Sequence, residues 1–346
     1  MEIKPTEISE EHSYTNIISV VCPVYSGEHF LVELTEQIAH VRNKFTASSA
    51  PVTIGEAVFV IDEAIDKSEA VLRELQQQHD WINVITLSTG YGQHAATAAG
   101  ILHTSGDWIV TLDEDLQHHP KYIPQLLAQA ISRQADITYA SPLQGPHNHF
   151  LRDGTSRLIK KMISWLTNNR HVSDFNSFRL IRGSIARAAA SVMGHDGYYD
   201  VVLGWFTHRI TVLKTEMKDI RVQQGEASGY TFKKLLSHAR RMFVSSQTKV
   251  MRSIGMLGLL ALMLSIGLGI YILQGVLMGD ALNVRGWSSL AFLTLFFGSV
   301  TCMLFFVLFE YLSILTLHNQ GKPTFYSVDR TADKQLLEHI DTLKTL

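Results

Sequence analysis

The chain has 346 residues, 46% of them hydrophobic, and a formal net charge of −2. That length can build a catalytic domain and leave material over, and the near-neutral charge excludes the global basic field that favours nucleic-acid binding. Cys22 and Cys302 both fall in apolar segments, so no disulfide framework is implied and the globular part is expected in a reducing, cytosolic compartment. The acidic, polar start, residues 1–11, is unlike a cleavable signal peptide, and none is expected.

Predicted strands and helices alternate along the first 140 residues. The strands are 17–21, 57–61, 84–87, 108–112 and 137–140, and the helices are 29–44, 67–79, 95–103 and 123–132. Such alternation predicts an α/β fold with a doubly wound, mostly parallel sheet and a ligand crevice at the carboxyl ends of its strands. Neither a G-x-G-x-x-G sequence nor a P-loop sequence occurs, so a dinucleotide enzyme or a P-loop NTPase is not favoured.

Two aspartates directly follow the apolar run 108–112. Side chains two residues apart share one face of an extended segment, so Asp113 and Asp115 are expected to converge at the carboxyl edge of the sheet. Their hard oxygens suit Mg²⁺ or Mn²⁺, whereas zinc prefers His and Cys. An acidic turn that closes a strand is the alternative. His118 and His119 lack metal-site spacing and are interpreted as loop residues.

Polar residues also follow the first three predicted strands. They are Pro23, Tyr25 and Glu28 after the first strand, Asp62 and Asp66 after the second, and residues 88–93 after the third. Each group alone is a weak signal, because polar residues are common after strands. Together with the aspartate pair, they predict four polar clusters along one edge of the sheet.

The composition changes near residue 250. Residues 254–278 carry no charge, and residues 287–317 carry only Glu310. Each stretch exceeds the roughly 20 helical residues that cross a hydrocarbon core. We therefore predict a transmembrane helical hairpin over residues 253–318, with a short loop at 279–286; a pair of buried core helices is the alternative.

Residues 231–252 predict an amphipathic helix lying in the headgroup region, with a helix packed under the domain as the alternative. Flanking charge gives the orientation of the hairpin. Its outer ends carry Lys249, Arg252, Lys322 and Arg330, whereas its connecting loop offers only Arg285 beside Asp280. The domain at residues 1–230 and the tail at 319–346 are therefore both expected on the cytoplasmic side of a cytoplasmic (inner) membrane.

Several segments resemble one known family. Ser19-Val-Val-Cys-Pro-Val-Tyr25 resembles the opening strand and loop of inverting family 2 glycosyltransferases, which have the GT-A fold. Residues 112–120 resemble the D-x-D-L-Q-x-x-P segment of the branch that uses polyprenyl phosphate as acceptor, whose members include dolichyl-phosphate mannose synthase. Residues 174–180 are similar to its acidic-then-Phe-Arg-Leu segment, and residues 225–230 to its G-x-S-x-Y segment. With the two spans, the resemblance to the bacterial two-span members covers residues 15–327.

The resemblance implies a membrane enzyme that moves a sugar from a UDP- or GDP-linked donor to undecaprenyl or dolichyl phosphate, with inversion. The product would serve cell-envelope glycan or lipopolysaccharide modification. The resemblance also implies Mg²⁺ or Mn²⁺ on Asp113 and Asp115, and a homo-oligomer such as a tetramer. An acceptor phosphate has its second pKa near 6 and is already nucleophilic at neutral pH, so a general base is optional. Asp174 is the candidate for one, and a structural turn acid is the alternative.

The predicted site has a donor part and an acceptor part. Nucleotide-sugar contacts are assigned to Pro23, Tyr25, Glu28, Asp62, Asp113 and Gln117. Acceptor-phosphate contacts are assigned to Arg152, Arg157, Arg179, Arg221, Ser228 and Tyr230. Arginine forks match phosphate oxygens, which is why Arg152 and Arg157 are preferred over Lys160 and Lys161, where a solvated basic face explains the charges equally well.

Three departures from the family pattern affect the site. The family's D-D-G-S motif is Ile61-Asp62-Glu63-Ala64 here, and its Arg-Asn after the third strand is Thr89-Gly90. Both places are where the nucleotide would lie, so base identity and ribose contacts stay open. The acid that directly precedes Phe-Arg-Leu in the family is Ser177 here.

Two rival functions follow from the same pattern. A processive polysaccharide synthase normally carries a Q-x-x-R-W segment, which this sequence lacks, and two spans are too few for a translocation channel. A catalytically silent membrane scaffold or lipid-binding protein of the same fold is the other rival. Retention of Asp113, Asp115, Arg179 and Tyr230 argues against it.

Overall fold

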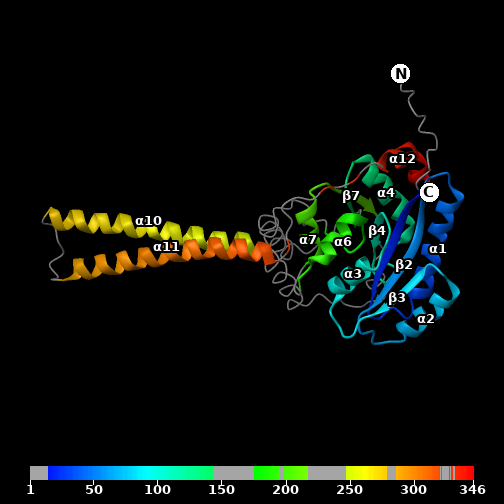
Figure 1. The fold of residues 1–346 in the computed structure, drawn as a ribbon, viewed down its shortest axis with the longest axis horizontal. Coiled ribbons are helices and arrows are strands. Elements are labelled where there is room, and N and C mark those ends of the chain that lie inside the picture. The colour runs from blue at the N-terminus through cyan, green and yellow to red at the C-terminus, as the bar shows by residue number, and fades with distance from the viewer. Residues whose placement is uncertain are drawn as a thin grey trace, which may run out of the picture.

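The computed structural model describes residues 15–142, 175–194, 198–216, 247–278, 286–319, 321, 327, 329 and 332–346. They form an α/β domain from which a long helical hairpin projects (Figure 1). Most of the predicted interfacial helix, residues 231–252, lies outside this part of the chain. Its last residues, from 247 on, belong to the first hairpin helix.

A seven-stranded sheet forms the middle of the domain. Its strands are β1 (Asn16–Val24), β2 (Val52–Ile61), β3 (Ile82–Thr86), β4 (Trp108–Thr111), β5 (Ile137–Pro142), β6 (Arg179–Arg182) and β7 (Ile210–Thr215). Their order is β3-β2-β1-β4-β6-β5-β7, and only β6 runs antiparallel to its neighbours. The predicted mostly parallel sheet is confirmed. The sequence did not reveal β6, because its four residues, Arg-Leu-Ile-Arg, begin and end with charges that are nevertheless buried.

Helices cover both faces of the sheet. The helices are α1 (Leu31–Ala47), α2 (Ser68–Gln78), α3 (Gln93–Leu102), the 3-10 turn η1 (Pro120–Tyr122), α4 (Ile123–Ser132), α6 (Gly183–Ser191) and α7 (Tyr199–Phe206). Apolar side chains of α1, α2 and α4 share one core with one face of β1, and those of α3, α6 and α7 pack on the other face. The alternation along β1 decides this division: Val20 and Cys22 enter the first core and Val21 the second.

The tail after the hairpin returns to the domain. Its helices α12 (Asp333–Glu338) and α13 (Ile340–Thr345) contact α4, and Leu336 and Leu343 are fully buried in the first core. Arg182 of β6 joins the two parts, because it pairs with Asp136 at 3.2 Å and with Asp333 of the tail at 2.6 Å. The segment predicted only as a tail is thus part of the domain's packing.

A cavity of about 720 Å³ lies between this tail and the amino ends of β1 and β4. Asn16, Asp107, Arg182 and Gln335 are among its lining residues. Asn16 is the first residue of β1, so the cavity lies at the sheet edge opposite Asp113. None of the predicted site residues lines it.

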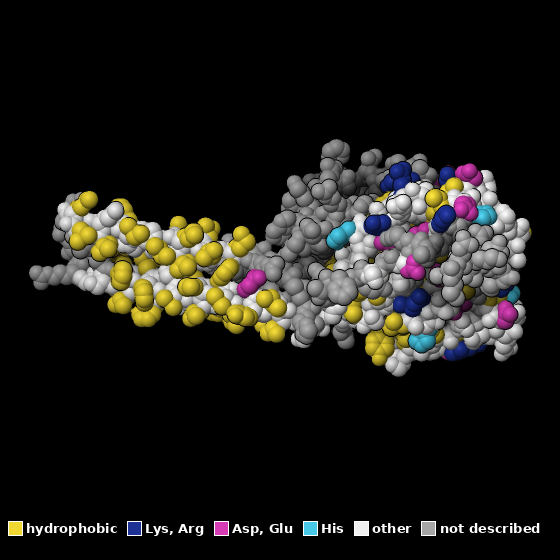
Figure 2. All heavy atoms as spheres, turned by 45° about the horizontal axis from the view of Figure 1, so that its top comes forward, with side chains coloured by type: hydrophobic (Ala, Val, Ile, Leu, Met, Phe, Trp, Pro, Cys, Tyr) yellow, Lys and Arg dark blue, Asp and Glu magenta, His cyan; other side chains and the backbone are white. Residues whose placement is uncertain are grey.

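The hairpin consists of α10 (Gln247–Leu277) and α11 (Trp287–Asn319). At about 1.5 Å per residue, each helix is longer than the roughly 30 Å hydrocarbon core of a bilayer. Their most apolar windows, Gly258–Gly275 and Ser289–Thr316, are 0% and 6% buried inside the protein. Figure 2 shows apolar side chains along both helices. A pair of soluble core helices would bury these side chains, so the hairpin has the length, composition and exposure of membrane-spanning helices.

Candidate functional site

The loops that follow β1, β2, β3 and β4 meet at one edge of the sheet, as the sequence predicts. Side chains from the loops after β2 and β4 accept hydrogen bonds from backbone N–H groups of the loops after β1 and β3. This arrangement follows from the parallel pairing of β1 with β2 and β4, which brings their carboxyl ends together. Acidic side chains therefore join these four loops to one another at this edge of the sheet.

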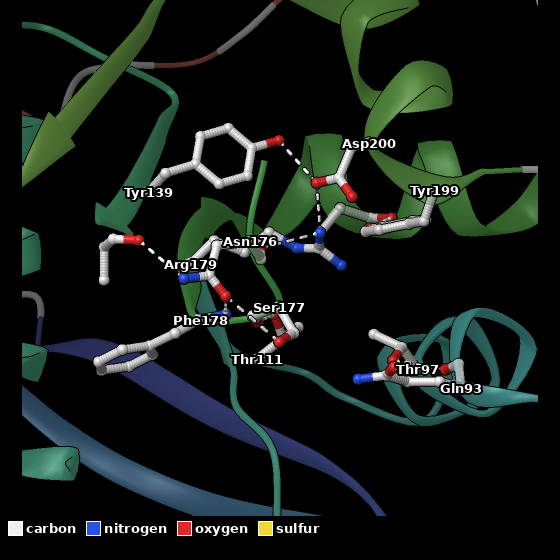
Figure 3. A network of polar contacts seen from close by, with 12 residues as sticks. Gln93, Thr97, Thr111, Tyr139, Asn176, Ser177, Phe178, Arg179, Tyr199 and Asp200 are labelled. Atoms are coloured by element: carbon white, nitrogen blue, oxygen red, sulfur yellow. Dashed lines mark hydrogen bonds and ion pairs between the residues drawn. The ribbon is translucent and has the colours of Figure 1, made fainter. Parts of the chain in front are cut away.

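Asp113 is oriented by two uncharged donors. Gln93 Nε2, at the start of α3, donates to Asp113 Oδ1 at 2.6 Å, and Ser177 Oγ donates to Asp113 Oδ2 at 2.6 Å. Ser177 is itself placed by Thr111 Oγ1, which donates to its carbonyl oxygen at 2.5 Å (Figure 3). These two hydrogen bonds hold the Asp113 carboxylate in one orientation at the edge of the sheet.

His118 holds the backbone of the same aspartate. Its ring is buried, lies 5.2 Å from the Phe178 ring in a stacked arrangement, and accepts the Asp113 backbone N–H at Nδ1 with a distance of 3.2 Å. Burial lowers the pKa of His118, although Asp113 and Asp115 oppose that shift. Within the described ranges no three His, Cys, Asp or Glu residues gather as a metal cluster. His118 thus orients the backbone at Asp113.

Asp115 follows on the same turn. Its Oδ1 accepts the Gln117 backbone N–H at 3.3 Å, and Leu116 between them has a positive φ of 58° that closes the turn. The chemistry of this donor set fits a divalent ion, because Mg²⁺ in nucleotide sites takes one or two carboxylates and fills its remaining positions with phosphate oxygens and water. Asp115 and Asp113 are the residues that would hold it.

Glu114, between the two aspartates, points to the opposite side. Its Oε2 accepts the Tyr25 backbone N–H at 2.9 Å and its Oε1 accepts that of Ser26 at 3.0 Å. Burial raises the pKa of Glu114, while these two hydrogen bonds oppose the shift. In the D-x-D pattern this position is the variable one. The same alternation that pairs Asp113 with Asp115 could have shown that Glu114 faces the loop after β1.

Asp62 and Glu63 hold the loop after β3. Asp62 is buried and accepts the backbone N–H groups of Tyr91 at 2.7 Å and Gly92 at 2.8 Å. Glu63, with a positive φ of 53°, accepts the Gly90 N–H at 2.9 Å. Both carboxylate oxygens of Asp62 are thus used within the chain, and its predicted nucleotide contact stays a prediction.

The loop after β1 carries the other donor-side predictions. Pro23 belongs to β1 itself, and the Tyr25 side chain is 53% exposed at the site edge. Glu28 accepts the Lys67 backbone N–H at 3.2 Å, and its own N–H donates to Asp66 at 3.1 Å. Tyr25 is placed where it can contact a ligand, whereas Glu28 takes part in joining two loops.

Arg179 lies inside the domain, not on its surface. It is 2% exposed, forms an ion pair with Asp200, and stacks over the Tyr199 ring at 5.0 Å. Tyr139 donates to the same Asp200 oxygen at 2.7 Å (Figure 3). Burial alone lowers the pKa of Arg179, but Asp200 reverses the shift and raises it. This pairing does not favour direct contact with an acceptor phosphate, and that assignment stays a prediction.

Six predicted site residues lie outside the described part of the chain. They are Arg152, Arg157, Asp174, Arg221, Ser228 and Tyr230. Their roles stay predictions. Gln93, within the predicted polar cluster 88–93, joins the candidate site by its contact with Asp113, and Glu114 and Ser177 join it without a predicted role.

Residues 19–188 match Glycosyl transferase family 2. A relative from Edwardsiella ictaluri, undecaprenyl-phosphate 4-deoxy-4-formamido-L-arabinose transferase, is 28% identical over 286 residues, which cover 82% of this chain and 84% of that protein. The protein of the same name from Salmonella typhimurium is 28% identical over 243 residues, covering 70% of this chain and 71% of its own. Residues 19–188 of this chain are therefore a Glycosyl transferase family 2 domain.

Among solved structures, the glycosyltransferase resembles glucosyl-3-phosphoglycerate synthase from Mycobacterium tuberculosis in complex with uridine diphosphate. That match has a TM-score of 0.45 and 13% identity, and it covers 67% of this chain and 80% of the other. The family match ends inside α6, so β7, the hairpin and the tail of this glycosyltransferase lie beyond it.

Proposed function

We propose that this glycosyltransferase moves a sugar from a nucleoside diphosphate to a polyprenyl phosphate, with inversion at the anomeric carbon. The observation that carries the proposal is the oriented Asp113–Asp115 turn in a chain that also has a hairpin long and apolar enough to span a membrane. The relatives' names support undecaprenyl phosphate as the acceptor. Membrane spans explain how a water-soluble donor meets a lipid anion.

The leaving nucleoside diphosphate develops negative charge during transfer, and a divalent ion held by Asp113 and Asp115 would neutralise that charge when bound. Gln93 and Ser177 hold the Asp113 carboxylate in one orientation. The exposed Tyr25 ring offers a stacking surface for the donor base. The proposed donor is linked to UDP or GDP.

The acceptor phosphate is a dianion at neutral pH and attacks the anomeric carbon without prior deprotonation. Arg152 and Arg157 are the proposed clamps for that phosphate, with Arg221, Ser228 and Tyr230 nearby in the family pattern. Asp174 would serve only if a base is needed.

The domain and the tail are proposed to lie on the cytoplasmic side of a bacterial inner membrane. Basic residues flank the outer ends of the hairpin, as the positive-inside rule expects. The contact of Arg182 with Asp333 supports one side for both parts. A homo-oligomer, such as a tetramer, is part of the same proposal.

Membranes that contain the protein test the proposed function directly. They are incubated with undecaprenyl phosphate, Mn²⁺ and labelled sugars linked to UDP or GDP, including 4-deoxy-4-formamido-L-arabinose. We expect label in the organic phase, attached through a phosphate and with the anomeric configuration opposite to that of the donor. No transfer from any donor would favour the silent scaffold instead.

A further inference from the structure

The loop after β1, residues 25–28 (the donor-side loop), lies beside the Asp113–Asp115 turn. Its four successive backbone N–H groups all donate to side chains of the protein. The pairs are Tyr25 to Glu114 Oε2 at 2.9 Å, Ser26 to Glu114 Oε1 at 3.0 Å, Gly27 to Ser68 Oγ at 2.9 Å, and Glu28 to Asp66 Oδ2 at 3.1 Å. Successive N–H groups of this kind often bind the phosphates of a ligand. Here the four N–H groups bind side-chain oxygens of the protein in place of ligand phosphates, and two of these oxygens belong to Glu114.

Strand register explains why Glu114 reaches this loop. β1 and β4 are parallel neighbours, with Val21 opposite Thr111, so the segments that follow them leave the sheet side by side. Alternation along the chain then directs Asp113 toward Gln93 and Ser177, and Glu114 the other way. One short turn therefore contacts both sides of the predicted donor site.

Gly27 allows the close approach of the carboxylate. A Cβ atom at this position would lie 2.8 Å from Glu114 Oε2, closer than such atoms pack. The glycines with a positive φ in the described residues are Gly92, Gly286 and Gly321, so the Gly27 backbone itself would accept alanine. Glycine here provides space for Glu114, the nearest neighbour, and for Leu31, whose Cγ would lie 3.2 Å from that Cβ.

We propose that Glu114 is a positioning residue that fixes the donor-side loop to the Asp113–Asp115 turn. Glu114 keeps the loop that carries Tyr25 at a fixed position relative to the turn that carries the two aspartates. Tyr25 and the aspartates can then contact the same nucleotide. This inference rests on the proposed function, because it takes this edge as the donor site. Glu114 itself needs no contact with donor, ion or acceptor.

Replacing Glu114 with glutamine removes one of two acceptors and presents an NH₂ group to a backbone N–H. Calorimetric titration of the solubilised full chain with UDP and with GDP, each with Mn²⁺, measures the effect. We expect the Kd of the nucleotide that binds wild type to rise about tenfold, as loss of a charge-assisted hydrogen bond implies. The KM for the nucleotide sugar should rise with it, while the KM for undecaprenyl phosphate stays unchanged. Glu74→Gln, an exposed change on α2, is the matched control.

A second variant keeps the test valid if Glu114→Gln folds poorly, which thermal unfolding would show. Gly27→Ala should weaken nucleotide binding by displacing the carboxylate, and it should have little further effect in a Glu114→Ala background. Nucleotide binding equal to wild type in a folded Glu114→Gln variant, or additive effects of the two alanines, would overturn the inference and leave the proposed function intact. Wild type that binds neither nucleotide would overturn both.

Discussion

At the scale of single residues, Ser177 distinguishes this chain from its family pattern. Where the pattern has an acid, the serine hydroxyl donates to Asp113 Oδ2 at 2.6 Å. An acid at the same position would place a second carboxylate beside Asp113, and the two negative charges would repel each other. The serine therefore orients the Asp113 carboxylate by a hydrogen bond and adds no charge beside it.

Ser177→Ala should lower kcat/KM for the donor about tenfold, because a hydrogen bond to a charged group is worth roughly 1.5–3 kcal/mol. Ser177→Asp should lower it further through repulsion of Asp113. Ser191→Ala, an exposed serine at the end of α6, is the control. Transfer assays over a range of donor concentrations measure the effect, and a Ser177→Asp variant more active than Ser177→Ala would contradict the argument.

Asp115→Asn should reduce transfer about 100-fold or more, because it removes a charge from the residues that would hold the divalent ion. The variant should stay folded and membrane-bound, because asparagine has the size of aspartate and its side-chain oxygen can still accept the Gln117 backbone N–H. Asp80→Asn, in an exposed position, should leave the rate unchanged. Removing metal with a chelator should stop wild-type transfer, and Mn²⁺ or Mg²⁺ should restore it. Wild-type rates in Asp115→Asn would refute the metal assignment.

At the scale of elements, two departures from the family pattern contact each other. Glu63, in the motif after β2, accepts the N–H of Gly90, in the motif after β3. A Cβ on Gly90 would lie 2.5 Å from Glu63 Oε2. The two changes therefore fit as a pair: the glutamate fills the space that a side chain at position 90 would need.

Gly90→Ala should raise the KM for the nucleotide sugar several-fold, because the added methyl group displaces Glu63 and the loop before α3. Glu63→Ala in the same chain should recover most of the loss. Gly194→Ala is the control, since a Cβ there would meet nothing within 4 Å. A double-mutant cycle on donor KM measures the coupling, and strictly additive effects would show that the two loops act independently.

At the scale of the whole molecule, the chain folds back after its hairpin and closes its own core. Leu336 and Leu343 of the tail are fully buried with side chains of α1 and α4. Arg182 stacks over Trp108 at 4.4 Å and pairs with acids of the domain and of the tail. The tail that follows the hairpin is thus packed into the domain.

Leu336→Ala should destabilise the protein by about 2–5 kcal/mol, as removal of a fully buried leucine side chain usually does. Leu337→Ala is the matched control, because Leu337 is the next residue and its own side chain is 51% exposed. Thermal unfolding of the solubilised protein, followed by near-ultraviolet circular dichroism, compares the two. Equal stability of both variants would mean that the tail does not contribute to the core.

The sequence predicted the first five strands, the sheet class and the edge that carries Asp113 and Asp115, because local periodicity determines these features. It did not predict β6 and β7, or that Arg179 lies buried against Asp200. An arginine in an apolar segment has the same local signature whether its partner is a phosphate or a distant aspartate. Only the partner, 21 residues away in the chain, distinguishes the two.

The sequence by itself therefore determined the family resemblance, the apolar hairpin and the acidic turn, since each is written in residues that are close together in the chain. The tertiary structure alone decided what Glu114, Gln93, Ser177 and the tail do. Their contacts join segments many residues apart, from 20 between Gln93 and Asp113 to 151 between Arg182 and Asp333. Hydrogen bonds and apolar packing at those separations depend on the register of the sheet, which no local pattern encodes.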